Sequence, residues 1–181
     1  MKILTSALLD ELKEITRQHV QYAQILTQKT EEELNVRTST YNWSTLECLE
    51  HLNRYGDFYI PEINRNISSA GKSSQPYFRP GILGNYFAKS MIPKEKMNKM
   101  KTLKAMNPIH SQIHKSVIDT FIKQQEKLLE LLEDARHTDL EKVKTNISIS
   151  KLIKLRLGDT FRFVIYHNLR HIEQIKRILP H

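Results

Sequence analysis

Two histidines, His167 and His171, lie four residues apart in the amphipathic segment FRFVIYHNLRHIEQIKRI at residues 161–178. In a helix this spacing places both imidazoles on one face. Position 171 falls on the apolar stripe that contains Val164 and Ile175, so we expect this face to be buried. A buried imidazole needs a partner for its nitrogen atoms, and a divalent metal ion is one such partner.

A catalytic metal site commonly has three protein ligands and an open position, so a third ligand is expected from another segment. His51 fits, because it shares a helical stripe with Leu52 and Tyr59 and therefore also points inward. We predict that His51, His167 and His171 form a metal site inside the protein. The alternative interpretation is that each of them is a hydrogen-bonded core residue.

Other side chains in the sequence could also act as ligands or catalytic groups. His110 and His114 have the same spacing of four at the start of a predicted helix, and we expect them to be exposed or near the site without being ligands. Cys48 is expected in the core, with a ligand or nucleophile role as the alternative. Tyr55 is expected to pack in the core or to line the pocket. Glu47 is assigned to a helix cap, so no carboxylate base and no further catalytic residue is identified.

The 181 residues are predicted to form one domain spanning residues 1–181. No apolar run approaches the roughly 20 residues of a membrane-spanning helix. The N-terminal residues turn acidic at Asp10 and do not resemble a signal peptide. The single cysteine cannot form an internal disulfide, which fits a reducing compartment, so we expect a cytoplasmic location.

The net charge of +8 is unevenly distributed along the chain. Residues 89–104 contain six lysines and one glutamate, a local charge of +5. This segment has no arginine and no aromatic residue, and both are common in surfaces that bind nucleic acid. Its composition therefore favours a solvated loop over a nucleic-acid-binding surface. We therefore expect neither nucleic acid nor a membrane as a partner. Nucleic-acid binding through this segment remains an alternative, and it would weaken steeply with salt.

Four segments show helical periodicity with few interior breakers, and they predict an all-α four-helix bundle. The predicted helices cover residues 4–29, 45–65, 109–134 and 159–178. Ser44 and Glu47 form a capping box at the second helix, and Pro108 precedes the third. A homodimer is plausible for such a bundle, but the sequence identifies no interface.

Two connections are too long for simple turns. The connection at residues 66–107 is rich in glycine, proline and aromatic residues, so we expect it to be partly ordered, with a short helix near residues 82–90, and to pack across one end of the bundle. The connection at residues 135–158 contains the alternating stretch NISISKLIKLRL. Because no partner strand is evident, we expect it to be extended.

The start of the second helix resembles that of the DinB/YfiT-like superfamily, which includes the bacillithiol transferases. In that family the second helix typically begins at a Trp-Ser pair and carries a ligand histidine before a leucine. Trp43, Ser44, Glu47, His51 and Leu52 stand at the matching places.

The last helix extends the resemblance, which covers residues 1–180 by helix order and spacing. The family pattern H-x-x-x-H-x-x-Q is matched by His167, His171 and Gln174, and the preceding residues 157–159, LGD, are similar to the family's usual helix start. The resemblance implies a four-helix bundle, and a metal site formed by His51, His167 and His171.

Three imidazoles favour a divalent transition metal such as zinc, nickel, manganese or iron. The ligands must be neutral, so affinity is expected to fall below the free histidine pKa of about 6.5. The metal would activate a water for hydrolysis or, as the resemblance suggests, a low-molecular-weight thiol for S-transfer to a small-molecule substrate. The alternative is a non-catalytic stress-response or binding module with a structural or vestigial metal site.

Overall fold

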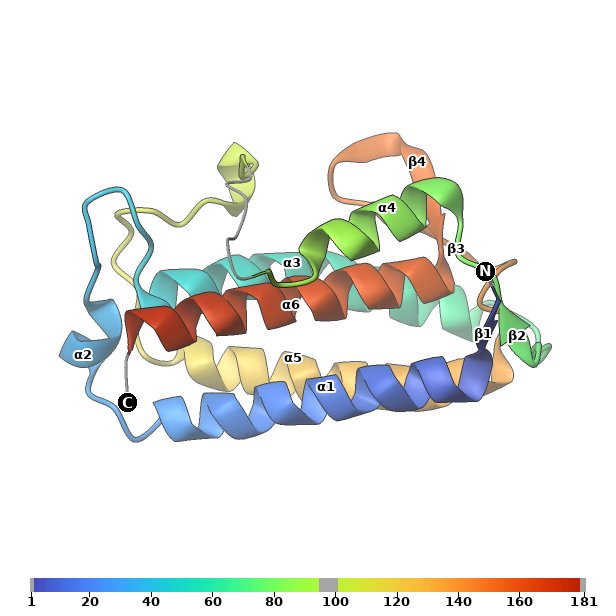
Figure 1. The fold of residues 1–181 in the computed structure, drawn as a ribbon, viewed down its shortest axis with the longest axis horizontal. Coiled ribbons are helices and arrows are strands. Elements are labelled where there is room, and N and C mark those ends of the chain that lie inside the picture. Colours follow the sequence, from blue (N-terminus) through green and yellow to red (C-terminus); the bar gives the residue numbers. More distant parts are fainter. Residues whose placement is uncertain (1, 95–100, 180–181) are drawn as a thin grey trace.

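The computed structural model describes residues 2–94 and 101–179 as an all-α bundle, which confirms the predicted fold class. Its four long helices are α1 (Thr5–Leu26), α3 (Thr45–Ser68), α5 (Val117–Asp134) and α6 (Leu157–Ile178). Each of α1 and α3 packs against both α5 and α6. Helices α3 and α6 run in opposite directions, so the start of α3 lies beside the end of α6 (Figure 1).

Shorter helices and strands precede or connect the four long helices. They are β1 (Ile3–Leu4), α2 (Glu31–Asn35), β2 (Tyr77–Phe78), α4 (Ile82–Met91), β3 (Lys144–Ile147) and β4 (Ser150–Arg156), with the 3-10 helices η1 (Lys104–Met106) and η2 (Ala135–His137). No helix in the described part of the chain combines the length and the apolar composition needed to cross a bilayer.

Local sequence signals explain the start of α3. The Ser44 hydroxyl accepts a hydrogen bond from the backbone N–H of Glu47, and the Glu47 carboxylate accepts one from the backbone N–H of Ser44. This is the predicted capping box, and it satisfies two N–H groups that the helix itself leaves unpaired.

The core consists of two apolar clusters along the bundle. One contains Tyr59, Phe161 and Phe163 toward the start of α6, and the other contains Leu49, Leu52 and Ile172 toward its end. On α6, His167 and His171 lie between the two clusters in sequence, whereas His51 on α3 lies beside Leu52 of the second cluster, and all three histidines are buried. The three histidines are therefore buried polar residues beside the apolar core.

The first long connection contains the expected short helix, now seen as α4. It packs along α6 rather than across one end of the bundle (Figure 1). The lysine-rich segment 89–104 falls partly on residues 95–100, which lie outside the described residues.

The second long connection corrects a prediction. Residues expected to be extended without a partner form an antiparallel hairpin, in which Lys144 pairs with Arg156 and Asn146 with Lys154. The partner strand is thus in the same connection, separated by a short irregular turn. Alternation alone could not reveal this pairing, because it says nothing about which strand lies opposite.

The third helix begins at Val117 and not at residue 109. His110 adopts a left-handed backbone conformation with φ of 61°, which a helix cannot include, and its N–H donates to the Glu47 carboxylate 63 residues away. This long-range hydrogen bond favours a turn over the helix that the sequence pattern predicted. His110 and His114 are therefore not neighbours on one helix face.

Two glycines allow close packing around the start of α6. A Cβ at Gly158 would lie 2.7 Å from the Phe78 ring, and a Cβ at Gly84 would lie 2.4 Å from Oδ2 of Asp159. Asp159 cannot move freely, because it is fully buried and accepts hydrogen bonds from Gly81 N–H and Arg162. Glycine at position 84 thus lets α4 lie directly on α6.

We predict that Gly84→Ala lowers the free energy of unfolding by about 1–3 kcal/mol, because the added methyl group displaces α4 or Asp159. Urea unfolding followed by circular dichroism measures this change. The control is Gly71→Ala, since a Cβ at Gly71 meets nothing within 4 Å. Equal stabilities for the two variants would contradict the tight contact.

Candidate metal centre

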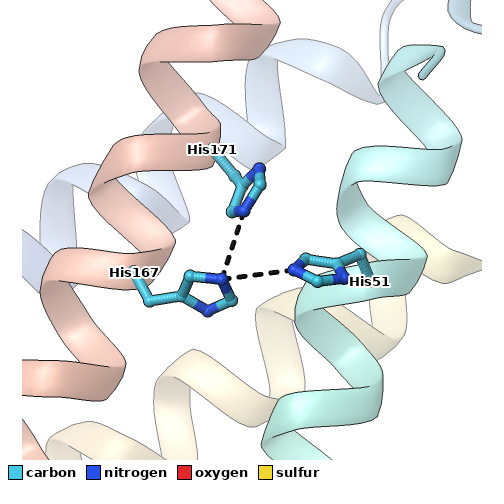
Figure 2. Close-up of side chains that lie close together, drawn as sticks. All are labelled: His51, His167 and His171. Atoms are coloured by element: carbon cyan, nitrogen blue, oxygen red, sulfur yellow. Dashed lines mark hydrogen bonds between the residues drawn. The ribbon is translucent and has the colours of Figure 1, made fainter. Parts of the chain in front are cut away.

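Three imidazoles from two antiparallel helices converge on one point (Figure 2). His51 comes from α3, and His167 and His171 come from successive turns of α6. Nε2 of His167 lies 3.2 Å from Nε2 of His51 and 3.1 Å from Nε2 of His171. One nitrogen from each of the three residues lies within 4.8 Å of the others. The structure thus brings together the three histidines that the sequence selected.

Hydrogen bonds at the far side of two rings define their tautomers. Nδ1 of His51 lies 2.6 Å from the carbonyl oxygen of Met106, and Nδ1 of His171 lies 3.0 Å from Oε1 of Gln174. Both partners accept, so each Nδ1 carries the proton and donates it. The Nε2 atoms of His51 and His171 therefore present lone pairs toward His167.

This arrangement suits a cation better than a set of hydrogen bonds. A neutral His167 has at most one proton on Nε2, so it can donate to His51 or to His171 but not to both. One buried acceptor would then be left unpaired, which is unfavourable. A cation at the convergence point would interact with all three lone pairs, and the residues present therefore fit a bound metal ion.

Burial keeps the imidazoles in the neutral form that binds metal. Desolvation lowers the pKa of His51 to about 4. The pKa values of His167 and His171 are also well below the usual value, first because of burial and then because of neighbouring positive charge, including Arg170. The expectation that affinity falls just below pH 6.5 thus shifts to a more acidic range.

Aromatic rings surround the three histidines. The Trp43 ring is centred 4.5 Å from that of His51, and the Tyr55 ring lies 4.6 Å from that of His167. Phe163 stacks parallel to His167 at 5.9 Å. Burial raises the pKa of Tyr55 to about 12, so its hydroxyl remains protonated. Tyr55 is thus both a core residue and part of the wall of the site.

Glu47 anchors the loop that orients His51. Its fully buried carboxylate accepts two hydrogen bonds from Arg37, at 2.8 and 2.9 Å, and one from the N–H of His110 at 2.6 Å. Burial acts to raise the pKa of Glu47, but these hydrogen bonds and that from Ser44 lower it overall. The carboxylate is therefore ionised and fully engaged, and it holds the segment that carries Met106.

Two further side chains hold the same loop. Nε1 of Trp43 donates to Oδ1 of Asn107 at 3.1 Å, and Arg54 donates to the carbonyl oxygens of Ala105 and Asn107. These loop contacts and the role of the Met106 carbonyl were not predicted from the sequence. A backbone acceptor 55 residues from its histidine leaves no pattern in the sequence that could reveal it.

The other candidates lie outside this cluster. Cys48 is buried in the core, and burial raises the pKa of its thiol, so it is neither ionised nor part of the three-residue group. His110 and His114 are exposed, and His114 lies 3.6 Å from Glu31. Among the described residues, His51, His167 and His171 form the group that could hold a metal ion.

The fold and the site define a class of protein: a four-helix bundle with a buried three-histidine group that could hold a metal ion. Residues 14–175 match the sequence model of the DinB superfamily. The chain therefore belongs to the DinB superfamily, which confirms the resemblance noted in its motifs. Comparisons with curated proteins and with solved structures gave no match.

We predict that the metal-free protein loses stability in acid because of these histidines. The pKa of His51 is lower in the folded state than the ordinary value of 6.5, so the unfolded state binds more protons between pH 6.5 and about 4. The free energy of unfolding should fall over this range, by roughly 3 kcal/mol for His51 alone. Chemical unfolding in the presence of a chelator measures the pH dependence.

The variant His51→Gln should show a shallower dependence on pH, since glutamine takes up no proton. His114→Gln is the matched control, because His114 is exposed. Identical pH profiles for His51→Gln and the parent protein would contradict the assigned burial cost.

Proposed function

We propose that His51, His167 and His171 bind a divalent transition metal and that the DinB-type site activates a water or a low-molecular-weight thiol. One observation carries the proposal: the Nε2 atoms of three buried imidazoles converge, and two of the rings are held with their lone pairs directed inward. Neutral nitrogen ligands favour zinc, nickel or iron over calcium or magnesium.

A bound divalent ion would supply positive charge that lowers the pKa of a water or thiol and stabilises the resulting anion. The chain adds to this effect through Arg170, a buried residue whose positive charge acts on His167 and His171. Trp43 and Tyr55 limit the access of bulk water from the sides on which they contact His51. Exclusion of water strengthens electrostatic interactions within the site.

Two reactions fit such a site. Activated water would hydrolyse an ester, an amide or a similar bond. An activated thiol would attack an electrophilic carbon of a small molecule, so that a carbon–sulfur bond forms while the bond from that carbon to a leaving group breaks, and the leaving group departs with a proton from solvent. The buried Glu47 is unsuitable as a base in either reaction, since Arg37 and two backbone N–H groups occupy its oxygens. The positive charge of a bound metal ion would lower the pKa of the water or thiol, so its proton would pass to solvent without a carboxylate base.

Further expectations accompany this function. A small molecule is the proposed substrate, and the reducing environment that a free thiol substrate needs agrees with the proposed cytoplasmic location. The single domain at residues 1–181 and a homodimeric state remain part of the proposal. The alternative function is a non-catalytic binding or stress-response module in which the same three histidines hold a structural or vestigial metal.

We predict that untagged protein, purified without chelator, contains about one equivalent of a transition metal per chain. His51→Ala and His167→Ala should each lose it, because two imidazoles hold the ion far less tightly than three. Elemental analysis measures the metal, and circular dichroism verifies that the helices persist. The control variant His114→Ala should retain the parent content, and a metal-free parent after incubation with zinc, nickel and manganese would refute the site.

The Gln174→Leu variant provides a graded version of this test. It removes the acceptor for Nδ1 of His171 but leaves all three ligands in place. Loss of such a supporting hydrogen bond typically weakens metal binding by about 10–100-fold. Competition with a chromophoric chelator measures this affinity. Unchanged affinity would show that Gln174 does not orient His171.

We predict that the metal retains a position open to a thiol or water, which separates the enzyme from the non-catalytic module. Adding a small thiol to cobalt-substituted protein should change its visible absorption spectrum. Assays with thiol–electrophile pairs and with activated esters should then show turnover that His167→Ala abolishes. A spectrum insensitive to thiol and to pH, together with no turnover, would favour the structural or vestigial site.

A further inference from the structure

Large apolar side chains that belong to neither core cluster lie together on an outer surface of the protein. Ile82, Leu83 and Tyr86 of α4 are 96%, 40% and 67% exposed, and Ile149 and Leu152 of the β3–β4 hairpin are 50% and 95% exposed. We call these five residues the α4–hairpin surface. Large apolar side chains this exposed on neighbouring elements are typical of an interaction site.

The two elements form one continuous surface. Helix α4 contacts β4, and Phe87 of α4 lines a small apolar cavity together with Ile149 and Leu155 of the hairpin. Both elements lie on the same side of the bundle (Figure 1). The inner side of α4 is already packed against α6 through Gly84, so Ile82 and Tyr86 are not required to hold the helix in place.

The charge around this surface is positive. Residues 79–94 contain three basic residues, and residues 142–156 contain five, while neither stretch contains an aspartate or a glutamate. Two of these eight basic residues, Lys142 and Arg156, form ion pairs with Asp139 and Glu141 just outside the second stretch, and the surface retains an excess of positive charge. Lys89 and Lys154 are exposed, and among the described residues neither forms an ion pair.

The combination of exposed apolar side chains and surrounding positive charge favours one kind of partner. Exposed aliphatic side chains gain by entering the outer apolar part of a bilayer, while the surrounding lysines are attracted to anionic headgroups. A second copy of the chain would bring like charges together. Nucleic acid would attract the lysines, but it offers no apolar phase for Ile82 and Leu152.

We propose that the α4–hairpin surface docks the protein on an anionic phospholipid bilayer, with Ile82 and Leu152 inserted at the interface and no segment crossing it. This departs from the expectation that the protein has no membrane partner. The proposal does not depend on metal binding, because its residues are separate from the three histidines.

Sedimentation with vesicles tests this proposal. One vesicle population is phosphatidylcholine alone, and the other is equal parts phosphatidylcholine and phosphatidylglycerol. The full-length protein should sediment with the anionic vesicles and not with the neutral ones, and added salt should weaken the binding because it screens the lysines. No sedimentation with anionic vesicles at low salt would overturn the proposal.

Two double variants separate the apolar contribution from the charge contribution. Ile82→Glu with Leu152→Glu, and Lys89→Glu with Lys154→Glu, should each reduce the partition coefficient at least tenfold. These side chains are exposed, so the folded state should persist, as thermal unfolding would verify. The matched control is Ile25→Glu on α1, where the isoleucine is 59% exposed and lies outside the surface, and it should bind like the parent protein.

Three outcomes would overturn the proposal in favour of another partner or none. Vesicle binding that survives both double variants would place the contact elsewhere on the molecule. Binding to duplex DNA or to RNA, lost in the lysine variant while vesicles remain unbound, would identify nucleic acid as the partner. A dimer in sedimentation velocity that the Ile82 and Leu152 substitutions dissociate, again without vesicle binding, would identify a second copy.

Discussion

The convergence of three imidazoles in the interior is the constraint on which the arrangement of this protein depends. Neutral histidines can be buried only if their nitrogens find partners, and three Nε2 atoms that face one another cannot satisfy each other with the protons available. Antiparallel packing of α3 against α6 creates the meeting point, and the two apolar clusters hold the helices in register around it. A cation resolves the shortage of donors, so the features that fit a metal also explain why these polar residues are tolerated in a core.

The loop over the site shows how helix capping and site geometry are coupled. Glu47 closes the capping box at the start of α3, and the same carboxylate binds Arg37 and the N–H of His110. The loop held in this way carries the Met106 carbonyl, which fixes the tautomer of His51. A residue that the sequence assigned to local helix stability therefore also determines, through a backbone segment about 60 residues away, which nitrogen of His51 faces the site. Disturbing Glu47 would affect the helix start and the orientation of His51 together.

The sequence predicted the bundle and the three histidines because both follow from periodicity within single helices. It failed where a distant contact decided the local conformation. The third helix was predicted to start at residue 109, but the hydrogen bond from His110 to Glu47 imposes a turn, and the helix starts at Val117. The stretch at residues 144–156 had the alternation of a strand, yet its pairing as a hairpin became visible only in three dimensions. The short helix near residues 82–90 was predicted, whereas its packing along α6 was not.

The sequence by itself determined which side chains face inward, because a spacing of four residues and the position of a capping box are properties of one helix. It thereby selected His51, His167 and His171, the capping residues Ser44 and Glu47, and the all-α fold. Only the tertiary structure decided how His51 is oriented, since its partner, the Met106 carbonyl, is a backbone group that looks the same in every residue type. It alone also placed the exposed side of α4 beside the hairpin, because two segments separated by more than fifty residues become one surface only when the bundle brings them together.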